Sequence, residues 1–192
     1  RIALILSMLE KDHYTDVLTA IYSSRLSSFA ELIMQIMHET ACKNNLGQTF
    51  LALEAPELHH HSSQRFFDGP KNMVGLFIKV TTPEHPLTIT VQKNLQDVYV
   101  RDAYLRMIDT LPYQKSMEFE YLGMKTRADE LRIPNITITL DAITPESTGA
   151  FLALWQYIAY YSALLRNVDP FTQPAVEASK DISFTLRKTF KP

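Results

Sequence analysis

The segment from Asp169 to Lys180 carries polar side chains at spacings that could place them around one ligand. Pro174 suits the first position of a helix, because its fixed φ is helical and its missing N–H would be unpaired there. Gln173, Glu177 and Lys180 follow at intervals of four and three, so they share one face near the helix N-terminus. That end of a helix attracts oxyanions, and the three groups could form a polar wall for a sugar-sized ligand. The spacing alone favours a plainer alternative, a solvated Glu–Lys pair at a helix entry.

A second polar pair stands near residue 40. Gln35 and Glu39 are four residues apart, so on a helix they lie on the same face. Taken by their spacing, they are an ordinary exposed helix face.

The histidines offer two kinds of chemistry. His59, His60 and His61 stand in a row, and imidazoles bind zinc, but three consecutive side chains cannot all point inward from one regular element. We therefore expect no metal site. His85 lies alone in a loop bounded by Pro83 and Pro86, where most histidines are structural or merely exposed. Its pKa near neutrality would suit it to proton transfer.

Beyond spacing, several of these segments resemble one family. The stretch from Asn167 to Lys180 resembles the C-terminal signature of the glucose-6-phosphate isomerases. The match departs from that signature at Thr172, usually Asp, and at Ala175, usually Gly. The residues that agree with the signature are Asn167, Phe171, Gln173, Val176, Glu177 and Lys180.

Three further segments resemble the same family. Residues 31–43 resemble the stretch whose glutamate abstracts and returns the substrate proton, which implies that role for Glu39. Residues 22–26 resemble a family turn, and residues 60–69 resemble a segment that shapes the neighbourhood of the active site. His85 matches the histidine that follows the equivalent strand, assists opening of the sugar ring and reaches the active site of the neighbouring subunit.

The resemblance implies the C-terminal sugar-isomerase (SIS) domain of an enzyme that interconverts glucose 6-phosphate and fructose 6-phosphate through an enediol. Glu39 would move a proton between C1 and C2, His85 would promote ring opening, and Lys180 would contact substrate oxygens. Gln35 and Gln173 would bind substrate. The family needs no cofactor, works as a homodimer and is cytoplasmic.

No segment resembles the family's phosphate loop or its enediolate-stabilising arginine, which belong to an N-terminal domain. We therefore expect residues 1–192 to be a single C-terminal SIS-like domain without its N-terminal counterpart. A non-catalytic module for sugar-phosphate binding or dimerisation is the alternative, and the departures at His38, Thr172 and Ala175 keep that alternative open.

Composition agrees with a globular domain. The 192 residues are 46% hydrophobic and 21% charged, with a net charge of −2, and show no basic stripe that would indicate a nucleic-acid partner. The single cysteine, Cys42, cannot form an internal disulfide, and no apolar run reaches the ~20 residues that cross a bilayer.

The pattern of apolar residues predicts helices alternating with strands, typical of a mostly parallel sheet covered on both faces. We expect an α/β three-layer sandwich of the flavodoxin-like kind, with ligands bound where loops meet at the carboxyl ends of the strands. Helices are predicted near residues 1–9, 26–43, 60–67, 96–131 with a break near 112, 145–165 and from 174 onward. Strands are predicted at residues 17–22, 49–53, 74–80, 87–91 and 135–140.

Overall fold

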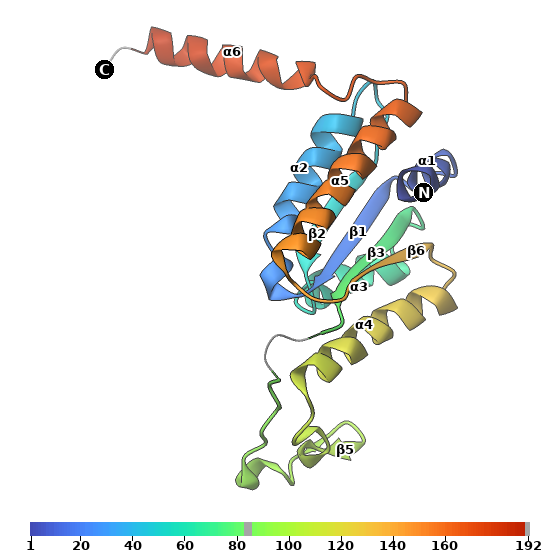
Figure 1. The fold of residues 1–192 in the computed structure, drawn as a ribbon, viewed down its shortest axis with the longest axis vertical. Coiled ribbons are helices and arrows are strands. Elements are labelled where there is room, and N and C mark those ends of the chain that lie inside the picture. The colour runs from blue at the N-terminus through green and yellow to red at the C-terminus, as the bar shows by residue number, and fades with distance from the viewer. Residues whose placement is uncertain (83–85, 191–192) are drawn as a thin grey trace.

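The computed structural model describes residues 1–82 and 86–190 and has a four-stranded parallel sheet at its centre (Figure 1). The strand order is β2-β1-β3-β6. The register sets Val17 of β1 opposite Phe50 on one side and Val74 on the other. The strands are β1 Asp16–Tyr22, β2 Thr49–Glu54, β3 Met73–Val80 and β6 Asn135–Leu140.

Helices cover both faces of this sheet, which confirms the predicted three-layer α/β fold (Figure 1). One face packs against α1 Ile2–Lys11, α2 Phe29–Ala41 and α5 Pro145–Leu165. The other packs against α3 Leu58–Asp68 and α4 Tyr113–Glu130. Central strands are buried on both faces, which explains why β1 and β3 read as nearly continuous apolar runs.

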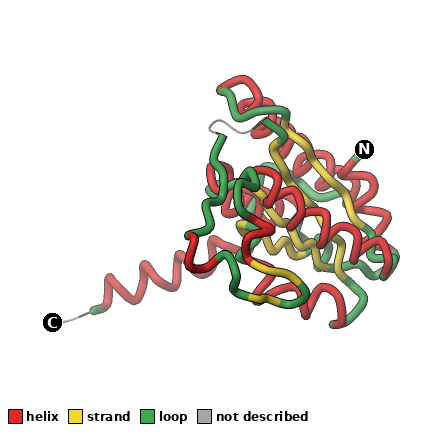
Figure 2. The backbone as a smooth tube through the Cα atoms, turned by 90° about the horizontal axis from the view of Figure 1, so that it is seen from below, coloured by secondary structure: helices red, strands yellow, loops and turns green. Residues whose placement is uncertain are grey.

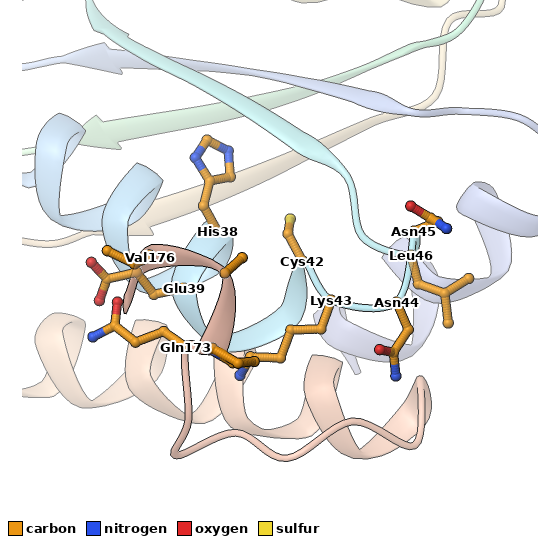
Figure 3. Close-up of a pocket in the computed structure, with 11 residues that line it drawn as sticks. His38, Glu39, Cys42, Lys43, Asn44, Asn45, Leu46, Gln173 and Val176 are labelled. Carbon is orange, nitrogen blue, oxygen red and sulfur yellow. The ribbon is translucent and has the colours of Figure 1, made fainter. Parts of the chain in front are cut away.

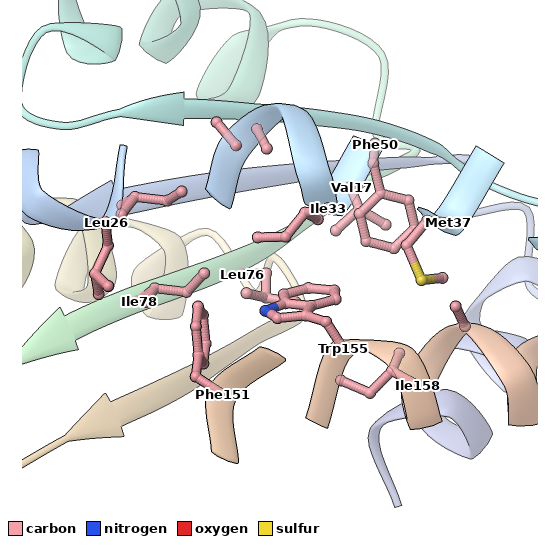
Figure 4. Close-up of a cluster of buried hydrophobic side chains, with 14 of the residues drawn as sticks. Val17, Leu26, Ile33, Met37, Phe50, Leu76, Ile78, Phe151, Trp155 and Ile158 are labelled. Carbon is pink, nitrogen blue, oxygen red and sulfur yellow. The ribbon is translucent and has the colours of Figure 1, made fainter. Parts of the chain in front are cut away.

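The larger of two hydrophobic clusters lies under α2 and α5 (Figure 4). Trp155 of α5 is fully buried, and its ring meets those of Phe50 and Phe151 edge-on, with centroids 6.2 and 6.3 Å away. Burying a side chain such as Phe50 stabilises the fold by about 1.5–3 kcal/mol. Trp155 therefore belongs to the core, whereas Tyr157 and Tyr161 stack against each other on the exposed side of the same helix.

Local sequence determines where α5 begins. Thr144 accepts a hydrogen bond from the backbone N–H of Ser147, and the Ser147 side chain accepts one from the backbone of Thr144. Pro145 occupies the first helical turn. This reciprocal cap satisfies donors that the first turn would otherwise leave unpaired.

Residues 87–112 differ from the prediction of a strand followed by a helix. Instead of a strand at 87–91, an isolated bridge joins Thr88 to Pro112. The expected helix at 96–112 is wrong as well, because Arg101 has a φ of 55° and turns the chain back on itself. The short elements found there are η2 Lys93–Leu95, β4 Tyr99–Val100, β5 Ala103–Tyr104 and η3 Leu105–Ile108, which precede α4. The segment extends away from the sheet below α4 (Figure 1).

The last helix, α6 Pro174–Thr189, projects from the body in both views (Figures 1 and 2). Its side chains are exposed throughout except for Ser183, which is half-buried. Ile182 and Leu186 lie one turn apart and share an exposed apolar face. No helix in the described parts of the chain is both long and apolar enough to span a membrane.

Candidate functional site

The predicted base stands on the exposed face of α2. Gln35 and Glu39 share that face, and the Gln35 amide Nε2 donates to the Glu39 carboxylate Oε1 at 3.3 Å. The buried side of the same helix, with Ile33 and Met37, packs against the core. The rigid core contact therefore fixes the direction in which Glu39 projects.

Glu39 borders a hollow of about 500 Å³ at the end of α2 (Figure 3). One wall is the end of α2 and the loop that follows it, and the opposite wall is the entry to α6. Figure 3 shows the Gln173 amide beside the Glu39 carboxylate. The hollow is lined by His38, Glu39, Cys42, Lys43, Asn44, Asn45, Leu46, Gln173, Pro174, Ala175 and Val176. Two sequence-predicted site residues from distant segments thus meet at one cavity.

The position of this hollow corrects one expectation. The loop after α2 leads into Thr49, the first residue of β2, so the hollow lies at the amino ends of the parallel strands. We expected ligand-binding side chains at the carboxyl ends. Glu39 departs from that rule because it sits in the last turns of a helix that runs back from the carboxyl edge.

Lys180 lies two turns into α6, beyond the residues that line the hollow. Its Nζ donates to Glu177 Oε1 at 2.9 Å, so the solvated pair that the spacing favoured is present. That hydrogen bond, with the negative charges of Glu177 and Glu39, raises the pKa of Lys180. The direct partner of the ammonium is therefore Glu177 rather than the predicted base.

His38, next to Glu39, was noted from the sequence as a departure and has a clear structural role. Its Nε2 accepts a hydrogen bond from the backbone N–H of Phe50 at 2.9 Å. Burial lowers the pKa of His38, which favours the neutral ring that this acceptor role requires. The imidazole thus ties the end of α2 to the edge strand β2.

The histidines of α3 separate from one another as the geometry of a helix demands. His59 points inward, where its Nε2 lies 3.0 Å from the Tyr22 hydroxyl and its Nδ1 lies 3.4 Å from Glu120. Burial lowers the pKa of His59 against the opposing effect of Glu120. His61 contacts Ser62 at the surface. Within residues 1–82 and 86–190, no three His, Cys, Asp or Glu side chains are grouped to hold a metal.

His60 lines a second hollow, of about 370 Å³, at the carboxyl end of β2. Glu54 and Glu57 are its acidic neighbours there. His85, the histidine that the sequence singled out, lies outside the described residues. The ring-opening role of His85 therefore rests on the sequence resemblance alone, whereas the structure places the imidazole of His60 at the carboxyl end of β2.

Sequence reasoning missed Lys43 as a site residue. Lys43 lines the hollow and donates to the backbone oxygens of Thr40 and Asp169. Lys43 lies just past the end of α2, and no local signal marks it, because its partner Asp169 is 126 residues away.

Comparison with known proteins identifies relatives that cover most of the chain. A glucose-6-phosphate isomerase of Mycoplasmopsis synoviae is 30% identical over 92% of this chain and 40% of its own length. A protein of Methanococcus maripaludis named probable glucose-6-phosphate isomerase is 26% identical over 84% of this chain and 34% of its own length. The chain thus spans about two fifths or less of these curated relatives. No family model matches it.

Solved structures share the fold. A hypothetical protein from Thermus thermophilus, TT0462, superposes with a TM-score of 0.89 at 19% identity, over 98% of this chain and 44% of its own. A glucose-6-phosphate isomerase from Chlamydia trachomatis gives a TM-score of 0.72 at 13% identity, over 98% and 39%. The curated homologues confirm the resemblance read from the motifs.

Proposed function

We propose that this chain is the C-terminal, sugar-isomerase (SIS) part of an aldose–ketose isomerase that interconverts glucose 6-phosphate and fructose 6-phosphate. The observation that carries the proposal is the hollow lined by both Glu39 and Gln173, with Lys180 two turns into the same helix that forms one of its walls. Relatives that bear the isomerase name match the chain across both of these segments. A sugar phosphate is the expected ligand, and the complete protein would act in the cytoplasm.

The chemistry would proceed through an enediol. Glu39 would remove the proton from C2 of the open-chain aldose and return it to C1, while a second proton passes from the C2 hydroxyl to the C1 oxygen, so the reaction balances without a cofactor. Gln35, hydrogen-bonded to Glu39, would hold the carboxylate in place, and Gln173 would bind the sugar from the opposite wall. Lys180 would stabilise the negative charge that develops on the substrate oxygens.

The length of the match leads to the first prediction. The complete gene product is expected to isomerise fructose 6-phosphate, whereas the 192-residue chain alone is expected to show little or no turnover. The reason is that binding of the substrate phosphate by the remaining protein orients C1 and C2 against Glu39. A coupled assay for glucose 6-phosphate on both proteins measures this. An inactive complete protein would leave the non-catalytic sugar-phosphate module as the better account, and full activity of the short chain would refute the need for a second domain.

We further propose a homodimer in which His85 assists ring opening in the neighbouring subunit's site. Glu39→Gln and His85→Asn subunits of the complete protein should each be nearly inactive. After mixing and reassembly, about a quarter of the sites would combine an intact Glu39 with an intact His85, so activity should return to about that level. The readout is the isomerase rate before and after reassembly.

The same mixing experiment with His60→Asn in place of His85→Asn is the matched comparison. Recovery with the His85 variant alone supports the proposed role. Recovery with the His60 variant alone would transfer the role to the histidine in the hollow at the carboxyl end of β2. Loss of activity without recovery in either mixture would contradict sharing between subunits.

A further inference from the structure

The hollow beside Glu39 has two walls that are far apart in the sequence. One is the end of α2 with the loop to residue 46, and the other is the entry to α6 at residues 173–176. The α6 wall is intrinsically weakly held, since its side chains are exposed and the helix projects from the body (Figure 1). A site between such walls needs a link that fixes their separation.

Lys43 makes that link. Its Nζ donates to the Thr40 carbonyl at 3.0 Å and also to the Asp169 carbonyl. The Thr40 carbonyl belongs to the last turn of α2, whose carbonyls lack partners within the helix and carry partial negative charge. The ammonium of the half-buried Lys43 thus completes the end of α2 and reaches across to the other wall.

The short segment after Asp169 connects the residue that Lys43 contacts to Gln173 in the hollow. The Asp169 carboxylate Oδ1 accepts a hydrogen bond from the backbone N–H of Phe171 at 2.9 Å, which turns the chain toward Gln173. The ring of Phe171 then lies 5.9 Å from that of Tyr160 on α5. Lys43 is therefore bonded to the residue that sets the direction of the loop into α6.

We propose that Lys43 is a positioning residue that holds Gln173 and the start of α6 at a fixed distance from Glu39. The effect of Lys43 on turnover rests on the function proposed above. Its hydrogen bonds to Thr40 and Asp169 are independent of that function. The competing role is direct binding of substrate, since an ammonium has three donors and two are used here. The two roles predict different results.

Two substitutions of Lys43 and one control separate them. Lys43→Met keeps most of the aliphatic stem and removes the donors, whereas Lys43→Arg keeps a cation with several donors. Lys71→Met is the control, because Lys71 likewise donates its Nζ to a helix-end carbonyl, that of Phe67, away from the hollow.

In the 192-residue chain, Lys43→Met should speed amide hydrogen exchange at Phe171 and Val176 on the order of 10-fold, as expected for loss of a charge-assisted hydrogen bond. Exchange in β1 and β3 should stay unchanged, which shows that the variant is folded. Lys43→Arg should restore slow exchange, and Lys71→Met should leave these amides unaffected. Unchanged exchange at both amides in Lys43→Met would overturn the proposal.

In the complete enzyme, Lys43→Met should lower kcat on the order of 10-fold with a smaller change in KM, and Lys43→Arg should recover most of it. A raised KM with unaltered amide exchange would assign Lys43 to substrate binding instead. Faster exchange with unaltered kcat would show that the link does not position the site. If the unmodified complete protein does not isomerise, the proposed function fails together with this positioning role, while the exchange data still decide whether the link exists.

Discussion

Glu39→Gln is expected to lower kcat of the complete isomerase by a factor on the order of 100 or more, with KM little changed. The amide keeps the shape of the side chain and one hydrogen-bonding oxygen, but it cannot accept the substrate proton. Gln35 lies on the same face at 3.3 Å, so the substituted amide retains a neighbour that can hold it in place.

Exchange of the C2 proton of the substrate with solvent is the decisive measurement, because it reports proton abstraction directly. Glu31→Gln is the matched control, since Glu31 lies exposed in the first turn of the same helix and should leave the exchange rate unchanged. Exchange at the parent rate in Glu39→Gln would show that another group is the base.

Lys180→Ala should reduce kcat/KM on the order of 100-fold, with kcat and KM both impaired. It deletes a cation that would face bound substrate oxygens and the charge that develops on them. The structural basis for this expectation is the place of Lys180 on α6, the helix whose entry forms the wall of the hollow opposite Glu39.

Steady-state rates at several salt concentrations test the role of Lys180. Lys188→Ala serves as the control, because Lys188 lies in the last turn of the same exposed helix. An equal loss in both variants would point to the general charge of α6, and parent-like kinetics of Lys180→Ala would remove Lys180 from the site.

The sheet and its helical layers could be predicted from the sequence because buried parallel strands leave long apolar runs. Val74–Val80 is such a run, and the structure places it in β3. The segment after it was misjudged, since β4 and β5 contain two residues each and turn at Arg101 and Asp102. Arg101 adopts positive φ, a conformation that glycine or asparagine usually supplies in a hairpin turn. The sequence has neither residue at this turn, so it lacks the usual hairpin signal.

The sequence identified candidate site residues, whose roles stay predictions, but it did not show which of them would lie together. Spacing put Gln35 and Glu39 on one helix face, and the structure confirms that placement and adds a hydrogen bond between them. That Gln173 lies across from Glu39 could not be read locally, because it depends on α5 returning the chain to the amino edge of the sheet. Lys43 was missed for the same reason, since its partner Asp169 is distant in sequence.

The packing of α5 has a consequence for the protein during its synthesis. Phe151 and Trp155 complete the cluster that buries Ile33 and Phe50, yet ribosomes make them after α1, α2 and all four strands of the sheet. Synthesis proceeds from the N-terminus at about 5–20 residues per second. The sheet face that packs against α5 is therefore incompletely buried in the nascent chain until α5 has been made. The order in which residues are made thus differs from the order in which they can be buried. The apolar surface of β1 and α2 is open to chaperones until α5 arrives.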